Sequence, residues 1–309
     1  MENTQSKCNL CPRECNVDRN KTKGFCGMQN DLVCARAALH MWEEPCISGS
    51  RGSGTVFFSG CTLRCVYCQN REIANGRIGK EISVNRLAEI FLELQDKKAN
   101  NINLVTPTHY TDKIIEALKL AKDRGLKIPV VYNTSGYEKV ETLKKLEGLV
   151  DVYLPDFKYI DSQISSEYSA APDYFEYAFK AIKEMVRQTG LSFFKEDDEL
   201  VVQGYVEEGI MKSGVIVRHL ILPGAVNDSK KIIKLLYETF SDEIFMSIMS
   251  QYTPLEAVAD HKTLNRTLTE EEYDEVVDFA IELGLTNAFI QEGEAAQESF
   301  IPRFDCEGI

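Results

Sequence analysis

Three cysteines lie close together in the segment FFSGCTLRCVYCQN, which covers residues 57–70. Cys61, Cys65 and Cys68 have the spacing C-x3-C-x2-C and follow an apolar run. A disulfide joins only two thiols, whereas three thiolates in one short loop suit a metal centre, either zinc or an iron–sulfur cluster. Structural zinc takes four ligands, and none follows Cys68 nearby, but a four-iron cube held by three cysteines keeps one iron open. Buried, inert cysteines are the competing interpretation.

The elements that must position this loop alternate along the chain from residue 55. TVFFSG is typical of a buried strand, and further apolar strands are expected at NINLV, IPVVYN, VDVYLP, GVIVRHLILPG, IFMSIMS and, as a short last strand, NAFIQ. Strands that alternate with helices predict a parallel sheet that is buried on both faces. The fold class is therefore α/β, a partial (β/α)6 barrel of the TIM type, in which polar residues at the carboxyl ends of the strands form the active site.

Helices are expected between these strands from the spacing of apolar residues and from end signals. They are placed after Ser83, from Thr111 to Gly125, between the third and fourth strands, at about 173–189, from near Asn227, and from the capping box of Thr269 and Glu272 to Gly284. Residues 195–213 interrupt the pattern, and the alternation of Val201, Val202 and Tyr205 predicts a small hairpin there.

Cysteine usage and charge divide the 309 residues unevenly. Nine of the ten cysteines lie in the first 68 residues, so residues 1–50 are expected to form a cysteine-rich arm. A flexible junction, SGSRGSG, then leads into a barrel with a C-terminal extension over 51–309. The first 80 residues hold 11 Lys and Arg against 7 Asp and Glu, within a chain of net charge −13. This end is either a docking face for an acidic partner or a chance excess.

The same composition excludes several functions and locations. A net charge of −13 argues against a dedicated nucleic-acid binder. The polar start MENTQSKCNL has no apolar segment of a signal peptide, and no apolar run reaches the length of a transmembrane helix. The expected location is cytoplasmic, without a membrane partner, and there clustered thiols indicate metal binding or catalysis more often than disulfides.

Within the arm, CNLCPRECNVDRNKTKGFC gives the spacing C-x2-C-x3-C-x10-C. Its cysteines, which form a possible second metal site, are Cys8, Cys11, Cys15 and Cys26. They hold zinc or an additional iron–sulfur cluster, or form a redox-active or unmetallated set of thiols. Cys34 and Cys46 are expected to be buried. His40, Trp42, Glu43 and Glu44 are interpreted as a structural link between the arm and the barrel, with substrate contact as the alternative.

The segment GCTLRCVYCQN resembles the signature of the radical S-adenosylmethionine (radical SAM) enzymes. The likeness extends over most of the chain, because MWEEPCISGSRGSG, VRHLILPG, MSQYTP and AAQESFIPRFD are similar to the PflX-type branch, akin to pyruvate formate-lyase activating enzymes. The resemblance implies a 4Fe-4S cluster on Cys61, Cys65 and Cys68, whose fourth iron binds the amino and carboxylate groups of S-adenosylmethionine. One electron then cleaves the sulfonium to methionine and a 5′-deoxyadenosyl radical, which abstracts hydrogen from a substrate.

Further site residues follow from the same resemblance. Tyr67 is expected near the adenine. LVTPTHY stands where the family usually has Gly-Gly-Glu, which nominates Thr106 and Thr108 for the amino group of the cofactor. YNTSGY resembles the segment that contacts the ribose and carboxylate, which nominates Asn133 and Ser135.

Three charged residues complete the predicted catalytic site. PDFKY resembles the Asp-x-Lys element of activating enzymes, which nominates Asp156 and Lys158. Arg218 is suited to bidentate pairing with a carboxylate. Arg218 and His219 are adjacent on one strand, so only one of them can point into the barrel.

The leading hypothesis is a radical SAM oxidoreductase that receives its electron from flavodoxin or ferredoxin. Its substrate is a glycyl-radical protein, a peptide or a small metabolite. The alternatives are a zinc- or iron–sulfur-binding scaffold without catalysis, or an electron carrier.

Overall fold

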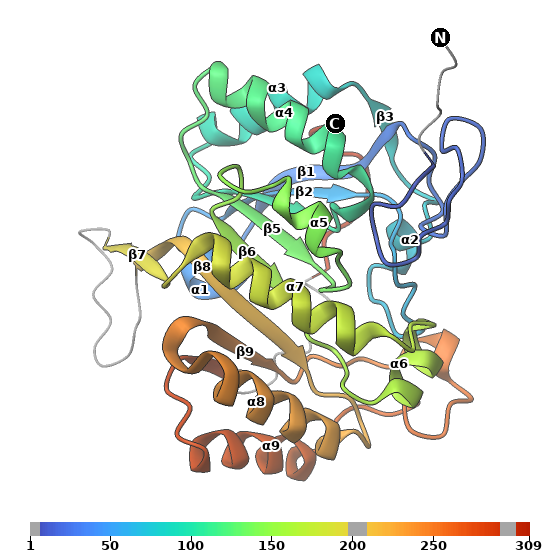
Figure 1. The fold of residues 1–309 in the computed structure, drawn as a ribbon, viewed down its shortest axis with the longest axis vertical. Helices are drawn as coiled ribbons and strands as arrows, with labels where there is room; N and C mark the ends of the chain where they lie inside the picture. The colour runs from blue at the N-terminus through green and yellow to red at the C-terminus, as the bar shows by residue number, and fades with distance from the viewer. Residues whose placement is uncertain (1–6, 197–208, 291–300) are drawn as a thin grey trace.

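The computed structural model of the chain describes residues 7–196, 209–290 and 301–309. Its centre is a sheet in which neighbouring parallel strands curve into a partial barrel (Figure 1). In pairing order these strands are β2 (Ser53–Phe58), β4 (Ile102–Val105), β5 (Val130–Thr134), β6 (Val152–Pro155), β8 (Gly209–Leu220), β9 (Phe245–Met249) and β10 (Ala288–Ile290). The predicted α/β partial barrel is thus confirmed, with the short last strand at its edge.

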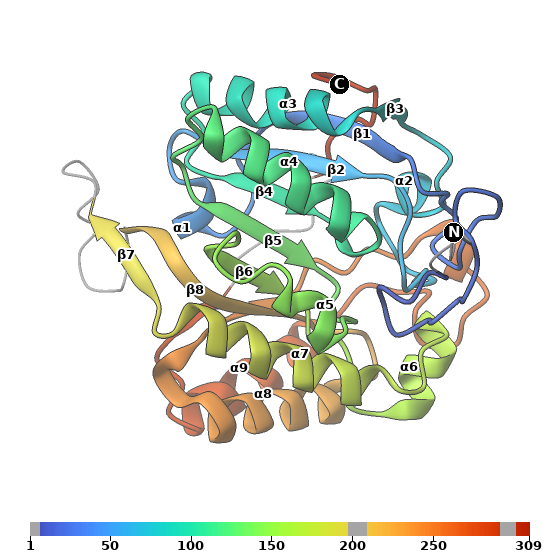
Figure 2. The ribbon, with the colours of Figure 1, turned by 45° about the horizontal axis from the view of Figure 1, so that its top comes forward.

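The longer helices cover the outside of this sheet (Figures 1 and 2). In chain order the helices of the described residues are α1 (Pro45–Ser48), α2 (Arg71–Ala74), α3 (Val84–Asp96), α4 (Thr111–Asp123), α5 (Val140–Lys144), α6 (Ser162–Ser169), α7 (Tyr174–Thr189), α8 (Val226–Phe240) and α9 (Glu270–Glu282), with short 3-10 turns at Thr108–Tyr110, Ser241–Glu243 and Glu256–Val258. Ser83 caps α3 by accepting the Arg86 N–H at 3.0 Å, and the predicted capping box of Thr269 and Glu272 begins α9.

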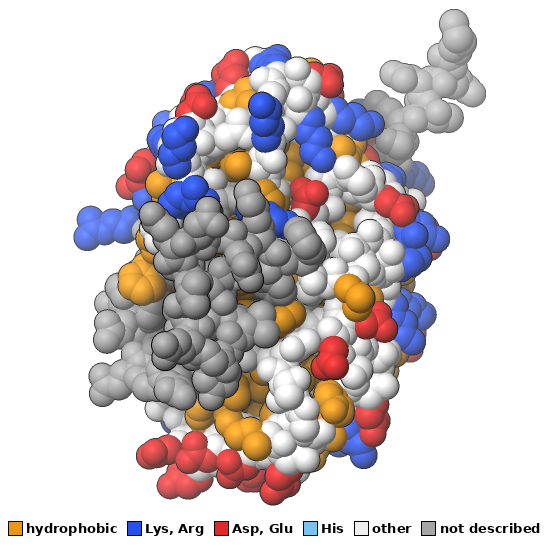
Figure 3. Space-filling model, turned by 90° about the vertical axis from the view of Figure 1, so that its left-hand side faces the viewer, with side chains coloured by type: hydrophobic (Ala, Val, Ile, Leu, Met, Phe, Trp, Pro, Cys, Tyr) orange, Lys and Arg blue, Asp and Glu red, His pale blue; other side chains and the backbone are white. Residues whose placement is uncertain are grey.

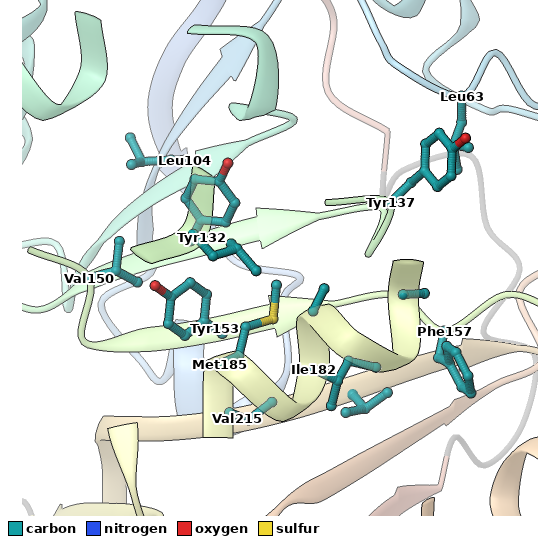
Figure 4. Packing of buried hydrophobic residues seen from close by; sticks show 14 of the residues in the cluster. Leu63, Leu104, Tyr132, Tyr137, Val150, Tyr153, Phe157, Ile182, Met185 and Val215 are labelled. Atoms are coloured by element: carbon teal, nitrogen blue, oxygen red, sulfur yellow. The ribbon is translucent and has the colours of Figure 1, made fainter. Parts of the chain in front are cut away.

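Successive residues of the strands face opposite sides of the sheet, which builds apolar clusters on both sides. On the outer side Tyr153 and Val215 pack against Ile182 and Met185 of α7, as Figure 4 shows. On the inner side a second apolar cluster contains Val131, Val152, Leu154, Ile216 and Phe245. This alternation explains why the strands are apolar on both faces.

The short helix α1 closes the bottom of the barrel. Its Cys46 and Ile47 pack within the inner cluster, beside residues from the amino-terminal ends of the strands. Asn101, which precedes β4, donates to the Ile47 carbonyl at 2.7 Å. Full burial of Ile47 is worth about 1.5–3 kcal/mol. Because α1 fills the floor, residues just before it face the interior above that floor.

The expected boundary at residue 50 is not where the sheet begins. β1 (Leu32–His40) lies within the segment assigned to the arm, but it pairs antiparallel with β2, and β3 (Lys80–Ile82) pairs with β1. The arm outside the sheet therefore ends near residue 31. Part of the SGSRGSG junction is also ordered as the start of β2.

The end of the chain returns to the same edge of the sheet (Figure 2). The Ala37 N–H donates to the Glu307 carbonyl at 2.8 Å, and Arg36 pairs with Asp305 at 2.9 Å and with Glu307. This tail covers part of the open edge of β1 and so limits pairing with other chains.

The predicted hairpin is described only in part. β7 (Phe193–Glu196) pairs antiparallel with β8, whereas Val201, Val202 and Tyr205 lie outside the described residues. None of the helices in the described ranges combines the length and apolar character that a bilayer crossing requires. Acidic side chains gather at the lower end of the molecule in Figure 3, at the height where α9, with its three glutamates in the first turn, lies in Figure 1.

Candidate functional site

The loop with the three cysteines leaves the carboxyl end of β2 and is held against the arm. Gly60 has φ 91°, and a Cβ at this position would lie 2.3 Å from Met28 Cγ and 2.8 Å from the Cys26 carbonyl oxygen. Only glycine tolerates both the backbone conformation and this close approach. The Cys61 N–H then donates to the Cys26 carbonyl at 3.3 Å. The sequence motif is therefore placed at the barrel mouth by contacts with the arm.

The three thiols suit an iron–sulfur cluster. Cys61, Cys65 and Cys68 are each half-buried, and a cavity of about 240 Å³ adjoins Cys65 and Cys68. Burial raises the pKa of Cys65, against the opposing effect of the Lys158 charge, and raises the pKa of Cys68 to about 12. Thiols in such surroundings ionise when a cationic metal centre binds them.

The arrangement of these sulfurs also bears on the kind of centre. A single zinc ion draws all its ligands to one point, whereas each cysteine of a four-iron cube binds a different iron. The donor set, the adjoining cavity and the spacing fit a cluster better than one ion.

A chain of hydroxyl groups ends on one of these sulfurs. Ser169 donates a hydrogen bond to Cys65 Sγ at 2.9 Å, and its oxygen lies 2.8 Å from the Tyr159 hydroxyl. The Tyr159 hydroxyl lies 2.5 Å from that of Tyr67. The Tyr67 ring is buried and lies edge-on to Tyr168 and Tyr252, and its expected contact with adenine stays a prediction.

The predicted catalytic residues come together in the barrel as a charged layer, which we define as Glu43, Asn133, Asp156, Lys158 and Arg218. Arg218 donates to Asp156 at 3.0 Å, to Glu43 at 3.3 Å and to Asn133. Lys158 donates to the other oxygen of Asp156 at 2.7 Å. The guanidinium group thus fixes three partners from three separate strands or loops.

Electrostatics differ among the carboxylates of this layer. Burial favours the neutral form of Asp156, but Lys158 and Arg218 outweigh it and hold the pKa of Asp156 below its usual range. Burial raises the pKa of Glu43 and of its neighbour Glu44, although Arg218 opposes the shift. Glu44 Oε2 is buried and lacks a hydrogen-bond partner among the described residues. The site therefore combines fixed charges with two carboxyl groups, those of Glu43 and Glu44, that are easier to protonate.

Glu43 and Glu44 were interpreted mainly as a link between the arm and the barrel, with substrate contact as the alternative. The structure places Glu43 inside the barrel, where it accepts from Asn103 at 2.9 Å and from Arg218. Pro45 begins α1 directly after them, and α1 fills the barrel floor. A usable signal was Asn103, a polar residue at an inward position of an otherwise apolar strand, because such a residue needs a buried partner.

Arg218 and His219 take opposite sides of β8, as predicted. Arg218 faces the charged layer, whereas His219 contacts the Phe157 carbonyl at 2.8 Å and the Ser229 hydroxyl of α8 at 2.9 Å. Burial lowers the pKa of His219 to about 4, so this ring is neutral and structural.

The other nominated residues are not all brought to the charged layer. Thr108 and Thr134 both donate to the fully buried Glu138, whose pKa burial raises to about 7. Thr106 ends β4 with φ 59°, and its N–H donates to the Asn133 carbonyl at 2.9 Å. The Ser135 carbonyl accepts from Tyr174 at 2.8 Å. Their roles toward the cofactor stay predictions.

Comparisons with known proteins agree with this geometry. Residues 55–193 match the family model of the radical SAM superfamily. The chain is 28% identical over 289 residues to an uncharacterized protein of Methanocaldococcus jannaschii, covering 90% of this chain and 75% of that protein. It is 27% identical over 208 residues to a pyruvate formate-lyase-activating enzyme of Clostridium pasteurianum, covering 64% of this chain and 74% of that enzyme.

Solved structures share the fold at low sequence identity. A radical SAM methyltransferase from Sphaerobacter thermophilus aligns with a TM-score of 0.54 and 12% identity over 80% of this chain and 69% of that chain. Streptococcus suis SuiB bound to S-adenosylmethionine aligns with a TM-score of 0.50 and 15% identity over 79% of this chain and 51% of that chain.

Proposed function

This chain carries a radical SAM superfamily domain, and from this premise we propose that it is an oxidoreductase that abstracts a hydrogen atom from its substrate. The observation that carries the proposal is the position of the cysteine loop beside the charged layer in one barrel. Lys158 belongs to that layer and also lies close enough to Cys65 for its charge to affect the pKa of the thiol.

Each part of the site has a distinct task in this proposal. Cys61, Cys65 and Cys68 would hold a 4Fe-4S cluster, and S-adenosylmethionine would bind beside it. When bound, the pair supplies a 5′-deoxyadenosyl radical by one-electron cleavage of the sulfonium. Asp156, Lys158 and Arg218 then hold polar groups of the substrate in a fixed orientation, because their mutual hydrogen bonds leave them little freedom. The α1 floor excludes water from below.

The class of substrate is a separate part of the proposal. We infer a glycyl-radical protein, a peptide or a small metabolite, and the similarity to the Clostridium pasteurianum activating enzyme supports the first of these. Placement in the PflX-type branch stays a prediction. Candidate substrates are separated by isotope transfer: deuterium from the labelled substrate should appear in 5′-deoxyadenosine.

The direct test is anaerobic reconstitution with iron and sulfide, followed by dithionite and S-adenosylmethionine. The proposal expects 5′-deoxyadenosine and methionine in equal amounts by chromatography. Bound zinc with no iron would support the scaffold alternative, and a reducible cluster that never cleaves S-adenosylmethionine would support the electron carrier.

Electron supply provides a further prediction, because exposed Arg64 and Arg71 line the cavity beside Cys65 and Cys68. We propose that flavodoxin or ferredoxin, which are usually acidic, docks by charge complementarity on this surface, which adjoins the arm as well because Arg64 lies over the Phe25 ring. In the double variant Arg64→Glu, Arg71→Glu, reduced flavodoxin should reduce the cluster more slowly, whereas dithionite should reduce it at an unchanged rate. Rapid-mixing absorbance measurements at low and high salt check this, since screening should remove the difference. Equal slowing with both reductants would exclude a docking role.

Ser169 provides a second prediction, because its hydroxyl donates to Cys65 Sγ. Hydrogen bonds to cluster sulfurs raise the reduction potential by stabilising the added negative charge. Ser169→Ala should therefore shift the midpoint potential to a more negative value in a spectroscopic redox titration. Ser165→Ala is the matched control, since Ser165 lies on the same helix and contacts the Ser162 carbonyl instead. An unchanged potential in Ser169→Ala would show that this hydroxyl does not tune the centre.

A further inference from the structure

The four cysteines of the arm lie near one another: beside the larger effect of burial, charges on Cys15 and Cys26 affect the pKa of Cys11, and charges on Cys8 and Cys15 affect that of Cys26. The Cys8 N–H donates to the Val17 carbonyl and the Asn16 N–H returns to the Cys8 carbonyl, both at 2.9 Å, which closes the loop that contains Cys11 and Cys15. Cys11 and Cys26 are buried, and Cys8 and Cys15 are half-buried. None of the ten cysteines of the chain forms a disulfide.

Two of these sulfurs lie against the same backbone position. A Cβ placed on Gly24 would lie 3.5 Å from Cys26 Sγ and 3.6 Å from Cys15 Sγ. The Phe25 N–H donates to Cys15 Sγ at 3.1 Å. An N–H group directed at sulfur stabilises the thiolate form, which is the form that binds metal. The arm therefore offers a small pocket of sulfur donors.

Contacts fix this pocket against the cysteine loop at the barrel mouth. Arg13 donates to the Thr62 carbonyl at 2.8 Å and to the Ser169 carbonyl at 2.9 Å. The guanidinium groups of Arg13 and Arg64 lie 4.0 and 4.7 Å from the centre of the Phe25 ring, so the two segments clamp this ring between them. Because these contacts fix the arm cysteines beside the barrel loop, we interpret the arm as part of the functional site and not as a separate structural module.

We propose that Cys8, Cys11, Cys15 and Cys26 hold a second iron–sulfur cluster, which passes electrons to the centre on Cys61, Cys65 and Cys68. The donors are all sulfur, which suits iron–sulfur chemistry. Their spacing, C-x2-C-x3-C-x10-C, differs from the paired C-x2-C…C-x2-C of a zinc ribbon. The electron transfer from the arm cluster to the barrel cluster rests on the proposed function, whereas the presence of the arm cluster does not.

The path between the two centres is short and continuous. It runs from Cys26 Sγ along the Cys26 backbone to its carbonyl, across the 3.3 Å hydrogen bond to the Cys61 N–H, and on to Cys61 Sγ. One electron from reduced flavodoxin or ferredoxin enters the arm cluster and leaves it for the barrel cluster, so the donor is oxidised once and the barrel cluster is reduced once. No proton or group moves with it.

Metal content tests the cluster itself. The anaerobically purified full chain should contain about eight irons, where a single four-iron cluster gives about four. After dithionite reduction, electron paramagnetic resonance should show two signals, of which only one changes when S-adenosylmethionine is added. About four irons together with one zinc, or about four irons alone, would overturn the proposal, and this measurement needs no variant.

A variant tests the electron path. The double variant Cys8→Ala, Cys15→Ala changes the two less buried ligands, and Cys306→Ala, in the C-terminal tail, is the matched control. The double variant should lose about half of the iron while keeping the signal that responds to S-adenosylmethionine. It should also lose 5′-deoxyadenosine formation with reduced flavodoxin but keep it with dithionite.

The outcomes separate the two proposals. Full iron content in the double variant would disprove the arm cluster, and unchanged turnover with flavodoxin would disprove the relay. If the unmodified chain forms no 5′-deoxyadenosine with dithionite, the proposed function fails, while its iron count still decides the arm cluster.

Discussion

Replacing Cys65 with alanine is expected to abolish 5′-deoxyadenosine formation. Cys65 supplies one of three sulfurs in the loop, and its Sγ accepts the Ser169 hydrogen bond and borders the cavity. Two remaining thiolates cannot hold a four-iron cube at three corners, so S-adenosylmethionine would lose the iron to which it binds. Chromatography of the reaction products under dithionite measures the effect directly, and absorbance near 400 nm reports the loss of the cluster.

A control separates this loss from general damage to the fold. Cys46→Ala removes a buried thiol in the apolar cluster of the barrel floor, outside both cysteine sets, and should cost about 1 kcal/mol of stability without loss of 5′-deoxyadenosine. If Cys65→Ala still formed 5′-deoxyadenosine at the rate of the unchanged protein, the assignment of this loop to the cluster would be wrong.

Replacing Arg218 with methionine is expected to lower the free energy of unfolding by more than Cys46→Ala does. The change keeps most of the side-chain volume but removes the cation that pairs with Asp156 and Glu43. Leaving a buried charge without its partner costs about 3–5 kcal/mol. For a domain of this size we therefore expect the unfolding midpoint to fall by roughly 10 °C in anaerobic calorimetry. Hydrogen abstraction should fall as well, because the carboxylates are no longer held in place.

The pH dependence of this loss identifies its electrostatic origin. Because the pKa of Asp156 lies below its usual value, its pairing stabilises the fold at pH values above the usual pKa and is lost as the pH falls through the lowered one. In Arg218→Met the carboxyl groups become easier to protonate, so the difference in midpoint should shrink toward acidic pH. The unfolding midpoint of Arg218→Lys, which keeps the positive charge but not the forked guanidinium group, should lie between those of the unchanged protein and Arg218→Met. A difference that does not shrink as the pH falls from 5 through 3.8, the usual pKa of an aspartate, would mean that lost packing, not lost charge, is responsible.

Much of the fold could be read from the sequence because its signals are local. Apolar runs predicted the parallel strands β2, β4, β5, β6, β8, β9 and β10, and the capping box predicted the start of α9. The spacing of Cys61, Cys65 and Cys68 identified the loop because all three residues belong to one turn. Likewise, the alternation along β8 predicted that only one of Arg218 and His219 faces inward. Each inference depends on residues that are neighbours in the chain.

The composition of the site was decided only by tertiary structure. Glu43 and Arg218 are 175 residues apart, yet they pair because Glu43 precedes α1 and faces the interior above the barrel floor, where β8 places Arg218. The same holds for β1, assigned to the arm but paired with β2, and for Cys26, whose carbonyl meets the Cys61 N–H. The sequence by itself determined which residue types and elements are present. Which of them meet was decided by packing, because contacts between distant segments depend on how the sheet curves and leave no periodic signal along the chain.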